Sequence, residues 1–356
     1  MLFCVNIYCE EKTERNMHID SLVLQRQLEF EDKFLSRYAC KSKNSKGRKI
    51  AEESCHFRTN FQRDRDRILY CKSFLRLKNK TQVFFQPESD HYRTRLTHTL
   101  IVAQVAKSIA RALSLNEDLA EAIALGHDLG HTPFGHAGER VLNNLMQNYG
   151  GFEHNRQSLR NVEVLENDGK GLNLSYEVCD GILHHKKTGT PMTLEGQAVS
   201  LADRIAYLTH DIDDAIRAKI LKEDDLPKDV LQNFGHKTSE RVNSSILYIY
   251  QESKDKPYVR FPKEIEESFN NLRTFMFDFV YQTEYTKLQE VKIAKMLTAL
   301  FEYYLEHITE MPMLYQNIAK QSNNHVAVCD FIASMTDKYA VHTFKKVFIP
   351  KDWTLD

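Results

Sequence analysis

The segment EAIALGHDLGHTPFGHAGE, residues 121–139, decides how the whole chain is interpreted. An apolar run with helical spacing ends at Gly126, and His127 and Asp128 follow it directly. Neighbours on a regular helix point about 100° apart, so two adjacent ligands converge on one ion only near a helix end. Gly126 and Gly130 flank the pair, and the segment therefore predicts an irregular helix end that turns both side chains toward one point.

Histidines are concentrated around this segment. Six of the fifteen fall within residues 91–154, with carboxylates among them. Histidine and carboxylate ligands without thiolates suit Mn²⁺, Fe²⁺ or Mg²⁺ better than a structural zinc site. The chain offers four such ligands: His98, His127, Asp128 and the distant Asp203. A His-Asp dipeptide by itself is explained more simply by a helix-ending histidine followed by a capping aspartate, so the rest of the chain has to decide.

Apolar spacing through the rest of the chain predicts an all-α fold. Glycine (13) and proline (8) are few among 356 residues, and long stretches repeat apolar residues with a period of 3.6. Residues 93–115 are predicted to form one helix, with His98 at its inward edge. Residues 116–125 are predicted to form the next helix, with Asn116 as its N-cap.

A further helix is predicted over residues 201–216. Its apolar residues recur at i+4 along one side and leave Asp203, Tyr207 and Asp211 stacked on the other. Taken alone, such a stripe is a solvated polar face. It also places three polar side chains in one row, where they can contact a common ligand.

Composition bounds the class of protein. An apolar content of 42% supports a sizeable core, and 48 Lys and Arg against 49 Asp and Glu leave a formal charge of −1. Without a basic excess, neither nucleic acid nor a membrane surface is indicated as the main partner. Seven scattered cysteines without a CxxC pair argue against a disulfide framework and favour a reducing cytoplasm. Apolar stretches of 18 residues do not occur, so no membrane span is expected.

Several stretches resemble the bacterial dGTPase-like branch of the HD phosphohydrolase superfamily. Besides residues 121–139, they are HYRTRLTHTLIVAQVA (91–106), CHFRTNFQRDRDRILYCKSFLRLKNKTQVF (55–84), SYEVCDGILHH (175–185), ADRIAYLTHDIDDAIRA (202–218) and VCDFIASMTDKYAV (328–341). With the helical spacing, this resemblance leads us to expect an all-α HD-domain core with a C-terminal helical lobe. The expected regions are a disordered extension (1–18), an N-terminal helical segment (19–90), the HD metal-dependent phosphohydrolase core (91–218) and the C-terminal helical lobe (219–356).

The resemblance also implies roles for the residues of the site. The implied ligands of a divalent Mn²⁺, Mg²⁺ or Fe²⁺ ion are His98, His127, Asp128 and Asp203. His136 and Glu139 are implied as a catalytic pair, in which the i, i+3 spacing lets the carboxylate orient the imidazole; the alternative is a helix-capping arrangement. His131 is expected to reach a phosphate or the catalytic water, or else to support neighbouring histidines.

Substrate-binding residues are implied in the same way. A triphosphate brings about four negative charges, which require basic groups nearby. The residues expected near the phosphates are Arg95, Arg204 and His154. Tyr207 is expected to fill the space of a ribose 2′-hydroxyl, and Asp211 and Gln82 to contact the 3′-hydroxyl. Without the resemblance, His154 is a surface histidine.

Three arginines of FQRDRDR, residues 61–67, alternate with acidic residues. This pattern predicts salt bridges within or between helices. The alternative that the sequence leaves open is a role in assembly.

The reaction that the resemblance implies is hydrolysis of a deoxynucleoside triphosphate, dGTP or several dNTPs, to a deoxynucleoside and inorganic triphosphate. Further expected partners are copies of the chain in an oligomer such as a hexamer, an allosteric second nucleotide, and weakly bound single-stranded DNA. One alternative is another HD phosphohydrolase, such as a nucleotidase or an alarmone hydrolase. The other is a nucleotide-regulated nucleic-acid-binding protein, which the neutral charge disfavours.

Overall fold

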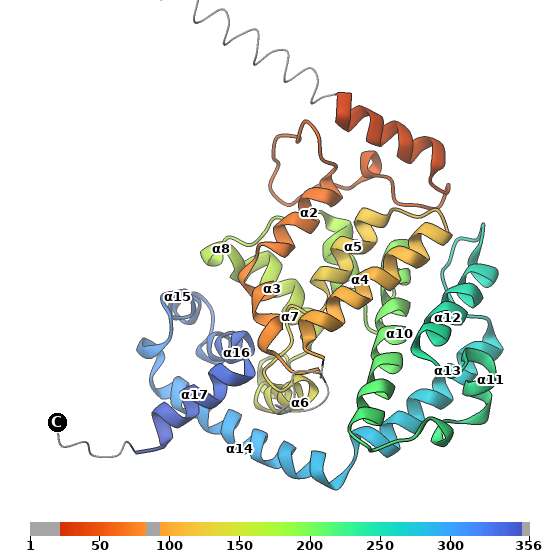
Figure 1. The fold of residues 1–356 in the computed structure, drawn as a ribbon. Coiled ribbons are helices and arrows are strands. Elements are labelled where there is room, and N and C mark those ends of the chain that lie inside the picture. Colours follow the sequence, from red (N-terminus) through yellow and green to blue (C-terminus); the bar gives the residue numbers. More distant parts are fainter. Residues whose placement is uncertain (1–21, 83–92, 351–356) are drawn as a thin grey trace, which may run out of the picture.

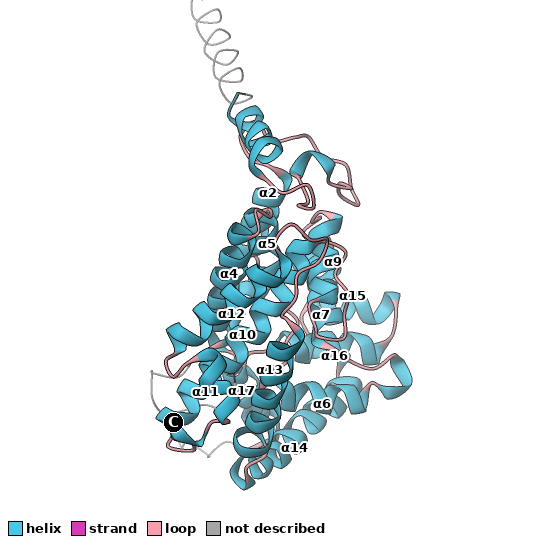
Figure 2. Ribbon diagram, turned by 90° about the vertical axis from the view of Figure 1, so that its right-hand side faces the viewer, coloured by secondary structure: helices cyan, strands magenta, loops and turns pink. Residues whose placement is uncertain are grey.

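The computed structural model describes residues 22–82 and 93–350, and every regular element in these ranges is helical (Figure 1, Figure 2). Extended pairing within them is limited to two isolated bridges, between Arg48 and Ser175 and between Thr81 and Thr94. The predicted all-α fold is confirmed. The extension expected at residues 1–18 lies outside the described residues, and the boundaries of the other three regions stay predictions.

The helices are grouped here by their order along the chain. The N-terminal ones are a first helix over residues 22–34, α2 (Asn60–Leu69) and α3 (Lys72–Arg76). The central ones are α4 (Arg95–Ala112), α5 (Glu117–Gly126), α6 (Gly135–Leu145), α7 (His154–Arg160), α8 (Glu166–Gly169), α9 (Tyr176–His184) and α10 (Leu194–Arg217). The C-terminal ones are α11 (Lys228–Phe234), α12 (Thr238–Ser253), α13 (Lys263–Met276), α14 (Glu284–Glu306), α15 (Met313–Gln321), α16 (Asn324–Ser334) and α17 (Asp337–Phe348). Within the described residues, no helix is both long and apolar enough to cross a membrane.

The main core is built on α4, α5 and α10, which pack against one another (Figure 1). As predicted, the apolar stripe of α4 is buried, with Val105 and Ile109 on the inward side, and His98 is buried along with them. Asn116 caps α5 as predicted, because its side-chain oxygen accepts a hydrogen bond from Leu119 N at 3.2 Å. The buried face of α4 and the start of α5 at Asn116 together place residues 121–139 in the middle of the molecule.

A second hydrophobic cluster joins α6 to the C-terminal helices. Phe134 and Leu142 pack there with Leu297 of α14 and with Val328 and Ile332 of α16. Figure 1 shows α6 beside α14 and close to α16 and α17. The helix α6, which contains His136, therefore packs against the C-terminal helices α14 and α16.

The connection between α5 and α6, residues 127–134, is irregular and is held against α7. Gly130 N donates a hydrogen bond of 2.8 Å to Ser158 Oγ, and that hydroxyl donates one of 2.6 Å to the carbonyl oxygen of His127. A Cβ atom on Gly130 would overlap the backbone of His154 and Ser158. This close approach requires glycine, and the predicted irregular helix end is confirmed.

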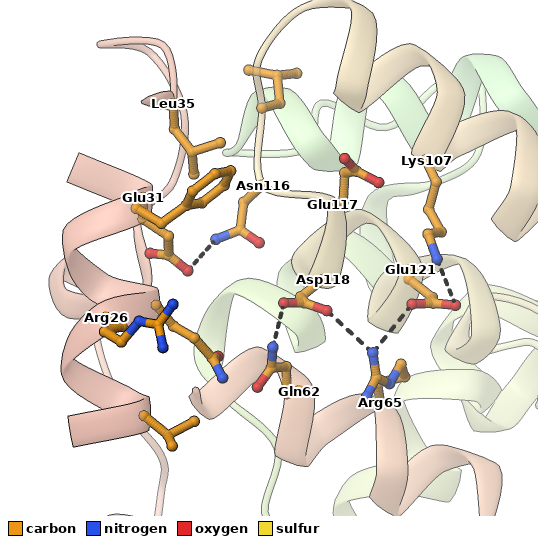
Figure 3. Close-up of a pocket in the computed structure, with 14 residues that line it drawn as sticks. Arg26, Glu31, Leu35, Gln62, Arg65, Lys107, Asn116, Glu117, Asp118 and Glu121 are labelled. Carbon is orange, nitrogen blue, oxygen red and sulfur yellow. Dashed lines mark hydrogen bonds and ion pairs between the residues drawn. The ribbon is translucent and has the colours of Figure 1, made fainter. Parts of the chain in front are cut away.

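The alternating charges of FQRDRDR form ion pairs inside the chain, as predicted. Arg65 contacts Asp118 and Glu121 of α5 at 3.1 and 3.4 Å, and Lys107 of α4 reaches Glu121 at 3.3 Å. These groups line a pocket of about 520 Å³ between the first helix and α2, α4 and α5 (Figure 3). None of the residues expected in the site lines this pocket.

Glu195, in the first turn of α10, is a fully buried carboxyl group. Its Oε1 accepts hydrogen bonds from the backbone N–H groups of Cys40 and Asn116, each at 2.9 Å, while its Oε2 has no partner among the described residues. Burial raises the pKa of Glu195 from 4.5 to about 7. As pH rises, the Glu195 carboxyl group therefore loses its proton at a higher pH in the folded chain than in the unfolded chain.

This carboxyl group predicts a pH-dependent loss of stability. Because the folded state binds the extra proton, the free energy of unfolding falls as pH rises between about 4.5 and 7 and stays low above that range. The loss through this group amounts to about 3 kcal/mol at most. Glu195→Gln should remove most of this pH-dependent fall in the free energy of unfolding. Urea unfolding of both proteins from pH 5 to pH 8 measures it. Equal pH slopes in the two proteins would contradict the prediction.

Candidate metal centre and active site

The four predicted metal ligands converge from three helices. His98 lies on α4, His127 and Asp128 follow the last residue of α5, and Asp203 lies on α10. Asp203 Oδ1 is 3.1 Å from His98 Nε2 and 3.6 Å from His127 Nε2. Asp128 Oδ1 is 3.5 Å from His127 Nε2, and its Oδ2 is 3.9 Å from His98 Nε2. The four side chains therefore surround one small volume.

The hydrogen bonding of His127 suits a metal ligand. Its Nδ1 donates a hydrogen bond of 2.6 Å to the carbonyl oxygen of Ala124, which directs Nε2 toward the cluster. That Nε2 atom is buried and has no hydrogen-bond partner among the described residues. An orphaned imidazole nitrogen facing a second imidazole and two carboxylates is the donor set of a divalent cation such as Mn²⁺, Fe²⁺ or Mg²⁺, so the residues fit the expected metal.

The charges of the cluster favour a cation in the same place. Burial by itself lowers the pKa of His127, but Asp128 and Asp203 outweigh it and raise that pKa to about 9. For Asp128 the two effects have the opposite signs. Burial by itself raises the pKa of Asp128, but the positive charges of His127, Arg95 and His98 outweigh it and hold that pKa well below its usual range. The carboxylates are thus ionised and draw positive charge toward the space between them.

Arg95, the first residue of α4, lies beside this cluster and is buried. Its Nη1 donates a hydrogen bond of 2.6 Å to Asp128 Oδ2. Its Nε and Nη2 atoms are buried and have no partner among residues 22–82 and 93–350. Since an unsatisfied guanidinium is costly in a protein interior, these two donors are suited to an anionic group bound in the site.

A second group of titratable side chains adjoins the first and comprises His131, His136, Glu139 and His154. The rings of His131 and His154 stack with centroids 4.0 Å apart, and the ring of His136 lies edge-on to that of His131 at 5.2 Å. His131 Nε2 also lies 3.3 Å from Asp128 Oδ1. The two groups are therefore in direct contact.

The predicted orientation of His136 by Glu139 is wrong. Glu139 instead accepts hydrogen bonds from the backbone N–H of His154 at 3.1 Å and from its Nδ1 at 2.9 Å. His154 is the first residue of α7, so its backbone N–H is free to be capped, and a carboxylate is favoured at a helix N-terminus. The i, i+3 spacing within α6 contained no information about this neighbouring helix.

His136 is exposed at the surface of the cavity, although many protein atoms surround it. Desolvation by these surroundings, together with nearby His154, lowers the pKa of His136 to about 4. Burial and the charge of Arg95 lower the pKa of His131 well below its usual range. Both rings are therefore neutral near pH 7 and available to accept a proton or a hydrogen bond.

Ten of the thirteen predicted site residues line one cavity of about 270 Å³, so most of the set does share a single space. The ten are Gln82, Arg95, His98, Asp128, His131, His136, His154, Asp203, Arg204 and Tyr207. The other three, His127, Glu139 and Asp211, are not part of its lining.

Asp211 is buried, contrary to the solvated stripe that the spacing alone suggests. It accepts a hydrogen bond of 2.6 Å from the hydroxyl of Tyr281, whose ring stacks on that of Tyr207 at 5.5 Å. An adjoining pocket of about 470 Å³ shares Gln82, His136, Tyr207 and Arg273 with the cavity and includes Tyr281 in its wall. Together the two hollows form an elongated space with the metal cluster at one end.

Arg204, like Arg95, has an acidic partner within the chain. Its Nη2 donates a hydrogen bond of 2.7 Å to Glu266 Oε1, and its guanidinium lies over the ring of Phe269 at 5.2 Å. It nevertheless lines the cavity, together with Lys187 and Arg273. The cavity wall therefore carries more positive charge than the two predicted arginines supply.

Sequence reasoning missed His185, Lys186, Lys187 and Arg273 as cavity residues. The Nε2 atoms of His185 and His154 lie 3.3 Å apart, and His185 Nδ1 donates to the carbonyl oxygen of Ile182 at 2.8 Å. The paired histidines at 184 and 185 were a usable signal. No pattern in the sequence pointed to Arg273, on α13, because the packing of α13 against α10 brings it to the site.

The chain is similar along most of its length to proteins of one family. The HD domain model matches residues 95–208, and the phosphohydrolase-associated domain model matches residues 259–346. A deoxyguanosinetriphosphate triphosphohydrolase-like protein of Caldanaerobacter subterraneus subsp. tengcongensis is 55% identical over 325 residues, which cover 91% of this chain and 95% of that protein. Another, from Clostridium perfringens strain SM101, is 49% identical over 331 residues, covering 90% and 96%.

Among solved structures, a phosphohydrolase from Bacteroides thetaiotaomicron VPI-5482 superposes over 79% of this chain and 68% of its own, with a TM-score of 0.48 at 19% identity. The assignment rests on the family models and the curated relatives. Their identity extends over nine-tenths of the chain and includes the His98, His127, Asp128 and Asp203 region. The chain therefore belongs to the deoxyguanosinetriphosphate triphosphohydrolase-like family of HD-domain phosphohydrolases.

Proposed function

We propose that the protein hydrolyses deoxynucleoside triphosphates to a deoxynucleoside and inorganic triphosphate. The observation that carries the proposal is a cavity in which two histidines and two aspartates that converge on one point adjoin Arg95, Arg204 and further histidines. The names of the curated relatives point to the same chemistry.

His98, His127, Asp128 and Asp203 would hold the divalent ion. When bound, such an ion supplies Lewis acidity that polarises a phosphate oxygen and offsets its charge. The cationic side chains of the cavity, Arg95, Arg204, Lys187 and Arg273, bind the triphosphate, because about four negative charges need partners in an enclosed space. Arg95 brings two unpaired N–H donors to this task and requires no rearrangement to use them.

The reaction forms a bond between a water oxygen and the α-phosphorus and breaks the bond from that phosphorus to the 5′-oxygen. The nucleoside leaves when its 5′-oxygen gains a proton, and the three phosphates leave together. His136 is the proposed proton carrier at its open ring nitrogen, since the neutral imidazole accepts a proton from water and returns it to the leaving oxygen. Glu139 holds His154 in place, and His154 in turn supports the stacked ring of His131.

The sugar is proposed to lie against Tyr207 at the junction of the two hollows. The stacked pair of Tyr207 and Tyr281 leaves little room for a 2′-hydroxyl, and the bond from Tyr281 to Asp211 fixes that pair. Gln82 offers a buried side-chain oxygen that has no partner in the described part of the chain, which suits a hydroxyl donor of the substrate. The site is therefore proposed to prefer deoxyribonucleotides over ribonucleotides.

The products of hydrolysis test the proposal. With dGTP or another dNTP and Mn²⁺, phosphorus NMR and chromatography should find deoxynucleoside and intact triphosphate in equal amounts, with GTP turned over at least about tenfold more slowly. Release of orthophosphate or pyrophosphate would contradict it and would indicate the alternatives, a nucleotidase or an alarmone hydrolase. Salt-sensitive binding of single-stranded DNA without any hydrolysis would indicate a nucleic-acid-binding protein.

Several finer expectations stay predictions beside this proposal. They are the identity of the ion among Mn²⁺, Mg²⁺ and Fe²⁺, assembly into an oligomer such as a hexamer, an allosteric second nucleotide, weak binding of single-stranded DNA, and a cytoplasmic location. Titration with each ion, sedimentation with and without nucleotide, and filter binding test them in turn.

A further inference from the structure

Three buried polar side chains connect the C-terminal helices to the elements that carry the site. They are Lys80, Asp330 and Asp337, each at most 2% exposed. None of the three lines the catalytic cavity. Burial of a charged group is unfavourable unless hydrogen bonds compensate for it, so the partners of these groups indicate what they hold in place.

Asp337, the first residue of α17, bonds to two segments that adjoin the cavity. Its Oδ2 accepts hydrogen bonds from Thr81 N at 2.9 Å and from Thr81 Oγ1 at 2.8 Å. Its Oδ1 accepts one from Phe134 N at 2.9 Å. Thr81 precedes Gln82, and Phe134 lies two residues before His136. One carboxylate thus fixes the spacing between the segment of Gln82 and the start of α6.

Phe134 is a position where such support is needed. Its φ angle of 63° places it in the left-handed region, which is unfavourable for a residue with a side chain. The hydrogen bond from Phe134 N to Asp337 and the packing of its ring in the second hydrophobic cluster oppose relaxation of this strained turn. The direction in which α6 leaves the turn, and with it the place of His136, depends on that conformation.

Lys80 joins the C-terminal end of α16 to the same turn. Its ammonium group donates a hydrogen bond of 2.9 Å to the carbonyl oxygen of Ala333 and another to the carbonyl oxygen of His131. Its own backbone carbonyl accepts a hydrogen bond of 3.0 Å from Arg95 N. The lysine therefore links α16 to the backbone of two residues that line the cavity.

Asp330, on α16, holds α7. Its carboxylate receives hydrogen bonds from Arg160 Nε and Nη2 at 2.8 and 2.7 Å, and from Gln157 Nε2 at 2.9 Å. Both donors belong to α7, which begins with His154. The bidentate geometry limits rotation and sliding of that helix.

We propose that Lys80, Asp330 and Asp337 form a positioning clamp, through which α16 and α17 set the relative places of His131, His136, His154 and Gln82 during the proposed reaction. Through these three residues, α16 and α17 then contribute to rate without lining the cavity themselves. A displacement of about 1 Å at a reacting group costs about 100-fold in rate, so loss of one clamp bond is expected to be measurable.

The test compares Asp337→Asn with Asp64→Asn. Asp64 is buried and its Oδ2 is bonded in the same way, since it accepts from Ser175 N at 2.9 Å and Ser175 Oγ at 2.5 Å; its Oδ1 differs in pairing with Arg48. It does not line the cavity. Asp337→Asn should lower kcat for dGTP about 10- to 100-fold with KM and Mn²⁺ affinity within about threefold, and Asp64→Asn should leave kcat within about threefold.

Substitutions at the partner residue grade the effect. Thr81→Ser keeps the hydroxyl donor and should retain wild-type kcat, while Thr81→Val loses one of three bonds and should fall between wild type and Asp337→Asn. Amide hydrogen exchange supplies a readout that does not depend on the reaction. Exchange at residues 131–136 should accelerate in Asp337→Asn and not in Asp64→Asn.

The outcomes separate the two proposals. Unchanged kcat and unchanged exchange in Asp337→Asn would overturn the clamp, and so would an equal fall in kcat in Asp64→Asn, which would indicate general destabilisation. If the wild type released no triphosphate, the proposed function would fail. Accelerated exchange confined to residues 131–136 would in that case still support the clamp, and unchanged exchange would overturn it.

Discussion

Replacing His127 with alanine is expected to lower kcat/KM for dGTP at least about 1,000-fold. The change removes one of four ligands and the only buried Nε2 among them that lacks a hydrogen-bond partner. Loss of the ion removes several kcal/mol of charge stabilisation from the transition state, and about 1.4 kcal/mol corresponds to a factor of ten. Steady-state kinetics and calorimetric titration with Mn²⁺ measure both consequences.

A histidine of similar burial provides the matched control. His210 lies on α10, is 7% exposed and does not line the cavity. His210→Ala should lose stability through the same loss of packing while keeping Mn²⁺ affinity and kcat/KM within about tenfold of wild type. Should His127→Ala bind Mn²⁺ as tightly as the wild type, the proposed ligand set would be wrong.

Replacing His136 with asparagine is expected to lower kcat about 100- to 10,000-fold while Mn²⁺ affinity stays within about threefold. The proposed role of His136 is to carry a proton, and asparagine keeps a polar group of similar reach but does not titrate. His136 also lies outside the four-ligand cluster. This variant should therefore lose activity and keep its Mn²⁺ affinity, whereas His127→Ala should lose both.

His325→Asn serves as the control for that substitution. His325 is half-buried, stacks on Tyr149 at 3.9 Å and is remote from the cavity lining. Its replacement should leave kcat and metal affinity as in the wild type. A His136→Asn protein with wild-type kcat would remove His136 from the mechanism and direct attention to His131 and His185, two further cavity histidines whose pKa is lowered.

The sequence allowed prediction of the fold and of the convergence of the metal cluster. Helical periodicity is a local property, so the capping of α5 by Asn116 and the inward edge of α4 at His98 followed directly from spacing. The convergence of Asp203 on His98 is different. It depends on how α10 packs against α4, and the family resemblance supplied what spacing within one helix does not contain.

The remaining features depend on contacts between helices that spacing does not encode. Glu139 turns to His154 because α7 begins beside α6 with a free backbone N–H. Asp211 is withdrawn from the cavity because Tyr281, 70 residues later, donates to it. Arg273 reaches the cavity through the packing of α13 on α10. Each is a tertiary contact between elements distant in the chain, which a single sequence does not reveal.

The close approach at Gly130 has a consequence for anyone who would redesign this enzyme. The loop from His127 to Phe134 is the natural place to diversify when a new substrate is sought. Residue 130 has no room even for a methyl group, since the backbone of α7 occupies that space. A library that randomised it would push away the helix that begins with His154, so most members would lose the catalytic geometry before substrate preference was sampled. Variation is better directed to the far hollow around Tyr281 and Arg273.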